Sequence, residues 1–322
     1  MVMAQTLFIE LKRRHPQANL DVLAPAWTRP LLERMPEVRN AIAMEMGHGE
    51  VRLKERKALG RQLMQAGYDQ SIVLPNSLKS ALVPFWAKIP KRTGWRGEMR
   101  YGLLNDLRKL DKAQYPLMIE RFVALALEKN APLPNPLPNP KLLIDNASRQ
   151  QALEKFGLEH VDKPVLAICP GAEFGESKRW PASYYAKVAE EKIQQGWQAW
   201  IFGSKNDVPV SQEIFGCLSE SAQKNCVQLC GETSLAEAVD LMSCGKMVVT
   251  NDSGLMHIAA ALSLPLIAVY GSTSPEFTPP LGEASQVVRS QLDCSPCFER
   301  ECPLGHGDCM KKIEPPQILK LF

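Results

Sequence analysis

The sequence predicts an α/β protein built from two doubly wound domains that face a cleft. Apolar runs typical of buried parallel strands alternate with helical stretches in the C-terminal half. A proline-rich stretch at residues 131–140 divides the chain, because its alternating prolines exclude both a helix and a central strand. The length of 322 residues, of which 45% are hydrophobic, is sufficient for two cores. We therefore expect one domain over residues 1–140, with the linker at its end, and another over residues 141–322.

The N-terminal half opens on an amphipathic helix rather than on a strand. The positions that recur at helical spacing are Val2, Met3, Thr6, Leu7, Ile9 and Leu11. The clearest later elements are strands at 20–23 and 72–74 and helices at 53–66 and 115–128. A doubly wound domain normally begins with a strand, so we expect a strand and a glycine-rich turn upstream of Met1. His15, His48 and His160 show no partner pattern and are expected at the surface.

The C-terminal half reads as a regular succession of strands and helices. Its expected strands are 165–169, 199–203, 227–230, 247–249, 266–270 and 286–289. A helix is expected from Pro181, because proline is favoured in a first turn, and another at 235–243. Because the strands should be parallel, the loops that follow them gather on one edge of the sheet, where open α/β sheets bind ligands.

Polar residues crowd three of these loops. After the strand at 247–249 come Asp252, Ser253 and Gly254, a helix start whose first amides are free to face an anion, with His257 one turn further. After the strand at 165–169 come Gly171, Ala172 and a charged loop with Glu173, Lys178 and Arg179. Glu232 follows the strand at 227–230. Amides and a lysine for phosphate, with carboxylates for hydroxyls, predict a nucleotide or nucleotide-sugar diphosphate bound without an obligatory metal.

The N-terminal half carries the strongest basic cluster, at residues 88–109. Its arginines are interleaved with Trp95 and Tyr101, a mixture suited to anionic sugars and phosphates. The alternative is a solvated basic face. The candidate binding residues are Asn76, Ser77, Lys79, Arg92, Arg96 and Arg100.

These motifs together resemble the ADP-heptose:lipopolysaccharide heptosyltransferases, most closely the heptosyltransferase II branch. The resemblance covers nearly the whole chain through PGAEFGESKRWP (170–181), GET (231–233), TNDSGLMHIAAAL (250–262), LPNSLKSAL (74–82) and RTGWRGEMRYGLLND (92–106). It implies the two-domain GT-B fold and an inverting transfer of L-glycero-D-manno-heptose from ADP-heptose. The implied acceptor is the heptosylated Kdo-lipid A inner core, approached at the inner-membrane surface with Trp86 and the basic face as contacts.

The resemblance also distributes the roles. It places Gly171, Ala172, Glu173, Lys178, Glu232, Asp252, Ser253, Gly254 and His257 on the donor, and the N-terminal basic cluster on the acceptor. It places the aspartate that serves as general base upstream of Met1, so the catalytic residue is unknown in this chain and the 322-residue form is expected to be weakly active. Two alternatives remain: another transferase of this fold, such as one that adds the first heptose, and a nucleotide-sugar-binding protein without turnover.

Composition and motifs argue against several other classes of protein. A net charge of +3 is too small to indicate nucleic-acid binding, and no apolar run approaches the ~20 residues that span a bilayer. Nine cysteines, spread through strands and helices, are typical of reduced core thiols in a cytoplasmic protein. Cys294, Cys297, Cys302 and Cys309 could hold zinc, but only the first pair has a standard metal spacing, so we interpret them as a reduced loop. The dinucleotide fingerprint of a nicotinamide dehydrogenase is missing, and no cofactor is expected.

Overall fold

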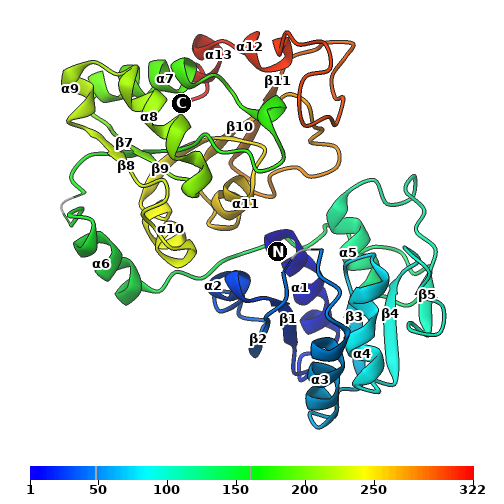
Figure 1. Cartoon of the computed structure of the whole chain (residues 1–322). Helices are drawn as coiled ribbons and strands as arrows, with labels where there is room; N and C mark the ends of the chain where they lie inside the picture. The colour runs from blue at the N-terminus through cyan, green and yellow to red at the C-terminus, as the bar shows by residue number, and fades with distance from the viewer. Residues whose placement is uncertain (48, 160) are drawn as a thin grey trace. The chain divides into compact units, whose positions relative to one another are not determined.

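Three parallel sheets organise the chain in a computed structural model that describes residues 1–47, 49–159 and 161–322 (Figure 1). Contacts divide the chain into a first unit of Met1 and residues 3–33 and 37–138, and a second unit of Val2 and residues 34–36 and 139–322. Residues 131–140 form neither helix nor strand. His15 is exposed, as expected, whereas His48 and His160 lie outside the described residues.

The first unit contains a two-stranded and a three-stranded parallel sheet. Its elements are α1 (Gln5–Arg14), β1 (Asp21–Pro25), α2 (Arg29–Leu32), β2 (Asn40–Met44), α3 (Leu53–Met64), β3 (Gln70–Val73), α4 (Leu82–Trp86), β4 (Lys91–Trp95), β5 (Asp106–Arg108) and α5 (Met118–Ala126). β1 pairs with β2, and β4 lies between β3 and β5. The Tyr68 hydroxyl, just before β3, donates to Asp21 of β1 at 2.7 Å and so joins the amino ends of the two sheets.

The second unit is a six-stranded parallel sheet with helices on both faces. Its elements are α6 (Asn146–Lys155), β6 (Val165–Cys169), α7 (Ala182–Gln194), β7 (Gln198–Ile201), α8 (Val208–Gly216), α9 (Glu220–Gln223), β8 (Cys226–Gln228), α10 (Leu235–Met242), β9 (Gly245–Asn251), α11 (Gly254–Ala261), β10 (Leu266–Tyr270), β11 (Ser285–Arg289), α12 (Asp308–Lys311) and α13 (Pro315–Leu319). All six expected strands are present. The helix expected from Pro181 begins at Ala182, and Pro181 is its N-cap.

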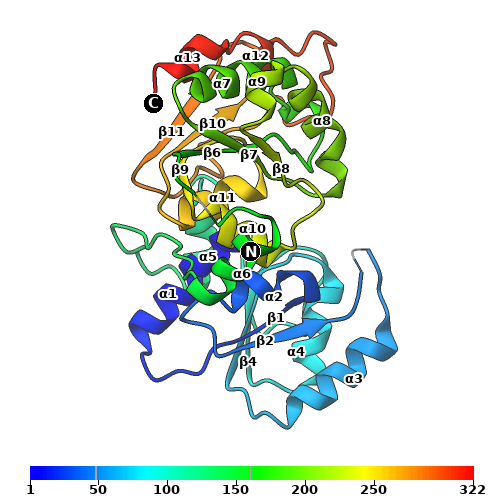
Figure 2. The same cartoon turned by 90° about the vertical axis from the view of Figure 1, so that its left-hand side faces the viewer.

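The core of the second unit follows from alternation along its central strands. Leu166 and Ile168 of β6 pack in a cluster with Tyr185 and Val188 of α7, whereas Ala167 between them is equally buried but points to the other face. Figures 1 and 2 show α7, α8 and α13 over one face and α10 and α11 over the other. Central strands buried on both faces explain why they read as unbroken apolar runs in the sequence.

Candidate functional site

The strand order of the second unit marks where a ligand is expected to bind. The sheet runs β11-β10-β9-β6-β7-β8, so the chain proceeds from β6 in one direction through β7 and β8, and from β9 in the other through β10 and β11. The order therefore reverses between β6 and β9. In open α/β sheets the crevice outside the carboxyl ends of the strands at such a reversal is the usual ligand site. Here those ends carry Gly171 after β6 and Asp252 after β9.

Asn251 holds the two loops at this point together. Its side-chain Oδ1 accepts hydrogen bonds from the Trp180 backbone N–H at 3.1 Å and from the Tyr185 hydroxyl at 2.9 Å. Its Nδ2 donates to the Pro170 carbonyl at 2.7 Å. Because Asn251 is fully buried, these bonds fix the loop that carries Lys178 against the end of β9.

Lys178 and Asp252 meet at the reversal point. Lys178 Nζ lies 2.6 Å from Asp252 Oδ2, and the same oxygen accepts the Thr273 hydroxyl at 2.6 Å. The side chains are largely buried, with exposed fractions of 13% for Lys178 and 6% for Asp252. A lysine so placed is held beside the crevice by a carboxylate and offers its remaining N–H donors to an anion.

The amino end of α11 lies open beside this pair. Ser253 is its N-cap but makes no capping bond with its side chain, which leaves the first amides of the helix without that acceptor. Around Gly254, the first residue of α11, the space where a Cβ would lie is open. The first turn therefore presents N–H groups and the positive end of the helix dipole to the crevice.

His257 lies one turn along α11. Its Nδ1 is buried and has no hydrogen-bond partner in the described part of the chain. Burial lowers the pKa of His257 to about 4, so the imidazole is neutral at physiological pH. A neutral imidazole with an unused nitrogen is suited to hydrogen bonding with a hydroxyl-rich ligand.

The other residues predicted to bind the nucleotide-sugar ligand lie further along the same sheet edge. Gly171 and Ala172 are buried, and Glu173 is exposed. A Cβ on Gly171 would come within 2.6 Å of the Asp207 carboxylate, so glycine allows the backbone to approach the loop after β7. Glu232 is exposed after β8. Since β8 is three strand positions from β9, about 14 Å at usual spacing, Glu232 cannot contact the same ligand atoms as Asp252.

In the first unit, the loops 75–80 and 95–104 are joined by specific contacts. The Glu98 carboxylate accepts the Leu78 N–H at 2.6 Å, and the Glu98 N–H donates to the Asn76 carbonyl at 3.0 Å. Gly97 lies so close to Asn76 that a Cβ would meet its carbonyl oxygen at 2.2 Å. The two sequence segments of the predicted acceptor side thus form one surface.

Arg100 corrects one prediction about that surface. Its side chain has no exposure and donates to the Pro75 carbonyl at 2.6 Å, to Ser80 Oγ and Asn76 Oδ1 at 3.3 Å, and to the Trp95 carbonyl. Burial lowers its pKa. A cation committed to these acceptors is not available to a ligand, so Arg100 positions the two loops instead of contacting an acceptor.

The remaining residues predicted on this surface differ in how far their side chains are free to contact a ligand. Arg92 is half-buried and donates to the Leu103 and Ile89 carbonyls at 2.7 and 2.6 Å. Arg96 is exposed, and no acceptor for its side chain occurs in the described part of the chain. Asn76 is exposed, and Ser77 and Lys79 are half-buried. An open recess next to these loops is lined by Phe85, Trp86, Lys88 and Arg92.

Sequence reasoning missed Asn251 and Thr273. Thr273 follows β10 in the run Gly271-Ser272-Thr273-Ser274, so its signal was a fourth polar loop after a predicted strand. Asn251 is the last residue of β9. A polar residue at the carboxyl end of a buried strand was the signal that could have identified it.

The cysteines are all free thiols. Cys169, Cys226 and Cys230 are buried, and burial raises the pKa of Cys226 and Cys230 to about 12, whereas Cys217 is exposed and is not a core thiol. Burial and the neighbouring Cys297, Cys302 and Cys294 raise the pKa of Cys309. Across residues 1–47, 49–159 and 161–322, no three His, Cys, Asp or Glu side chains are arranged to hold a metal ion.

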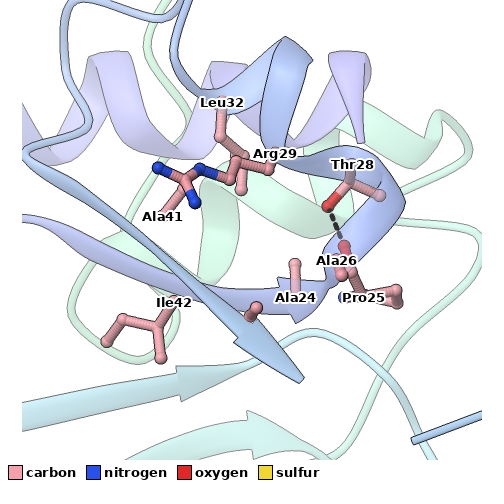
Figure 3. Close-up of a pocket in the computed structure, with 9 residues that line it drawn as sticks. Ala24, Pro25, Ala26, Thr28, Arg29, Leu32, Ala41 and Ile42 are labelled. Carbon is pink, nitrogen blue, oxygen red and sulfur yellow. Dashed lines mark hydrogen bonds between the residues drawn. The ribbon is translucent and has the colours of Figure 1, made fainter. Parts of the chain in front are cut away.

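A small hollow in the first unit is not a substrate site. It lies between α2 and the ends of β1 and β2, and Thr28 closes part of it through a hydrogen bond to the Pro25 carbonyl (Figure 3). The hollow leaves no room even for a water molecule, which is far below the ~300 Å³ at which pockets for small molecules begin. In the described residues, no helix has the length and apolar character needed to cross a bilayer.

Comparisons with known proteins agree on one family. The model of glycosyltransferase family 9 (heptosyltransferase) matches residues 56–307. Lipopolysaccharide heptosyltransferase 2 of Escherichia coli K12 is 48% identical over 325 residues, covering 99% of this chain and 93% of that protein. Lipooligosaccharide heptosyltransferase 2 of Haemophilus influenzae is 51% identical over 295 residues, covering 90% and 85%. The solved structure of E. coli ADP-heptose lps heptosyltransferase II superposes with a TM-score of 0.90 at 47% identity, covering 100% and 93% of the two chains.

Proposed function

Because the chain belongs to glycosyltransferase family 9, the heptosyltransferases, we infer that it transfers L-glycero-D-manno-heptose from ADP-heptose to the heptosylated Kdo-lipid A inner core of lipopolysaccharide. Its two α/β units are those of a GT-B glycosyltransferase. The observation that carries the assignment of the donor site is the Lys178–Asp252 pair beside the open amino end of α11, at the reversal point of the sheet.

This arrangement is suited to binding the diphosphate of the donor. We propose that Lys178 and the amides at Ser253 and Gly254 hold the two phosphates, and that Asp252 and His257 contact hydroxyls on the sugar side. Glu232, at the other end of the sheet edge, is placed for hydroxyls of the nucleoside. The nucleotide then extends along the edge from β8 towards β9.

The chemical step that this geometry favours is a single displacement. An acceptor hydroxyl attacks the anomeric carbon of the heptose while the bond from that carbon to the phosphate oxygen breaks. ADP leaves with the bonding electrons, and a base takes the hydroxyl proton. The cation and the helix dipole stabilise the charge that develops on the leaving phosphate, and one displacement inverts the anomeric centre.

The first unit is proposed to bind the acceptor. Lys79, Arg92 and Arg96 offer cations to its carboxylates and phosphates, with Asn76 and Ser77 as hydrogen-bonding groups and Arg100 holding their loops. Apolar side chains on or close to these loops are exposed: Leu78 by 38%, Phe85 by 40%, Met99 by 79% and Tyr101 by 65%. Such a mixture of apolar and basic groups supports a cytoplasmic protein that approaches the inner membrane peripherally.

The function is tested by measuring ADP release with purified acceptors that carry no heptose or one heptose. Release with the one-heptose acceptor alone is the expected result. Release with the heptose-free acceptor would identify the first transfer instead. Binding of ADP-heptose without release on either acceptor would identify a nucleotide-sugar-binding protein.

Arg96→Ala is expected to raise the acceptor KM about fivefold, equivalent to about 1 kcal/mol for one exposed charge-assisted contact, and to leave donor affinity unchanged. Steady-state kinetics with varied acceptor, together with calorimetric titration of ADP, separate the two effects. Arg61→Ala, an exposed arginine on α3, is the matched control. A fall in ADP affinity in Arg96→Ala would contradict the assignment of this unit to the acceptor.

A further inference from the structure

The segment after β11 is attached to the loop that carries Lys178. The Ser177 N–H donates to the Arg300 carbonyl at 3.1 Å, and the Ser177 hydroxyl donates to the Glu299 carbonyl at 2.5 Å. A Cβ at Gly175 would meet the Arg300 carbonyl oxygen at 2.3 Å, so glycine permits this close approach. The backbone at 299–300 is therefore fixed against the loop at 175–177.

The same segment is also fixed to the loop after β10. The Phe298 N–H donates to the Ser272 carbonyl at 2.7 Å, and Ser177 Oγ lies 2.9 Å from Ser272 Oγ. Ser272 precedes Thr273, which donates to Asp252. Residues 298–300 thus lie between the loops after β6 and β10, beside the Lys178–Asp252 pair.

The Phe174 ring lies near two cations beside the Lys178–Asp252 pair. Lys178 Nζ lies 5.0 Å and Arg300 Cζ lies 5.6 Å from the centroid of the Phe174 ring. The two differ in their other partners: Lys178 is paired with Asp252, whereas no carboxylate pairs with the exposed Arg300 in the described residues, its neighbours Glu299 and Glu301 included. The fixed backbone and the ring together limit the directions that the Arg300 side chain can take.

The charge of a bound diphosphate favours a second cation at this place. A diphosphate brings more than one negative charge to a site where the Lys178 cation is already balanced by the Asp252 carboxylate. The helix dipole of α11 contributes only about half a positive charge. A second cation at this place would balance the remaining charge of the ligand, and an arginine fork binds two oxygens of one phosphate.

We propose that Arg300 is a further donor-binding residue that holds the sugar-side phosphate of the nucleotide-diphosphate donor, opposite Lys178. This inference rests on the proposed function of the site. The choice between the two phosphates follows from the sheet: Glu232, assigned to the nucleoside, follows β8, whereas Arg300 is bonded to the loop after β6 and its neighbour Phe298 to the loop after β10, so residues 298–300 lie at the reversal point, away from β8. The phosphate nearer to Arg300 is thus the one that bears the sugar.

Titration of the full-length protein with ADP and with AMP tests the proposal, because AMP lacks the second phosphate. We expect Arg300→Gln to weaken ADP binding about tenfold and to change AMP binding less than twofold. Arg300→Lys, which keeps the positive charge but not the guanidinium fork, is expected to lose less ADP affinity than Arg300→Gln. Arg149→Gln, an arginine on α6, is the control. Raising the ionic strength should reduce the difference between wild type and Arg300→Gln.

Folding is not expected to confuse the result, because the substitution leaves the backbone bonds of residue 300 in place. Unchanged ADP affinity in Arg300→Gln, or equal losses for ADP and AMP, would overturn the inference. If the wild type binds ADP with the predicted Arg300 dependence but releases none in the transfer assay, the proposed function fails and the assignment of Arg300 stands. If the wild type binds neither nucleotide, both fail.

Discussion

Lys178→Ala is expected to weaken the binding of ADP-heptose by about 1.5–3 kcal/mol, or roughly 10- to 150-fold. The substitution removes a charge-assisted bond to phosphate. It also leaves the Asp252 carboxylate, which is 6% exposed, without its cation and next to an incoming anion. The lost bond to phosphate and the repulsion between Asp252 and the phosphate both weaken binding, so a loss in the upper part of this range is expected. Calorimetric titration with ADP-heptose measures the change.

Lys163→Ala provides the matched control for Lys178→Ala. Lys163 also makes a 2.6 Å contact, to Asn225 Oδ1, but both residues precede strands and so lie at the amino edge of the sheet, away from the proposed site. The affinity of the Lys163→Ala variant for ADP-heptose should equal that of the wild type. The double variant with Asp252→Asn should lose less affinity than Lys178→Ala alone, because the repelling carboxylate is gone. Unchanged affinity in Lys178→Ala would remove Lys178 from the site.

Arg100→Met is expected to lower the free energy of unfolding of the first unit by about 3–5 kcal/mol. Methionine preserves much of the volume but supplies no donors, so the carbonyls of Pro75 and Trp95 lose their hydrogen bonds to the buried side chain of residue 100. Urea denaturation followed by circular dichroism and by Trp fluorescence reports the loss, since Trp95 is buried beside the substituted residue.

Arg96→Ala is the control for that experiment, because it removes an exposed arginine from the same loop and should change the unfolding free energy by less than about 0.5 kcal/mol. A loss of under about 1 kcal/mol in Arg100→Met would show that other contacts hold the loops together. In that case Arg100 would return to the candidates for direct acceptor contact.

The second unit was largely predictable because its strands are buried on both faces. The run at 266–270 reads as a strand from composition alone, and β10 has those bounds. The polar loops after such strands then follow from parallel topology. The order of the strands could not be predicted from the sequence in the same way. Only that order shows that Glu232 and Asp252 are separated by two intervening strands.

The first unit was predictable in fewer of its parts. β4 lies inside the basic cluster, where charged residues concealed the buried Thr93, Gly94 and Trp95. Arg100 illustrates the limit for side chains: the sequence shows a cation in a cationic segment, but its burial depends on carbonyls at Pro75 and Trp95 that are brought together only by folding. The same holds for Arg300, whose position depends on contacts with Ser177, 123 residues earlier.

The reversal of strand order also has a consequence for the kinetics of folding. β6 and β9 are neighbours in the sheet although β7, β8 and the helices α7, α8, α9 and α10 intervene in the chain, and the Lys178–Asp252 contact closes a loop of 74 residues. Closing such a loop costs conformational entropy before its contacts form, so the central pair is a late event. The carboxyl ends of β6 and β9 do not face one ligand until then. Nucleotide affinity should therefore emerge in refolding experiments only with the last phase of assembly of this sheet.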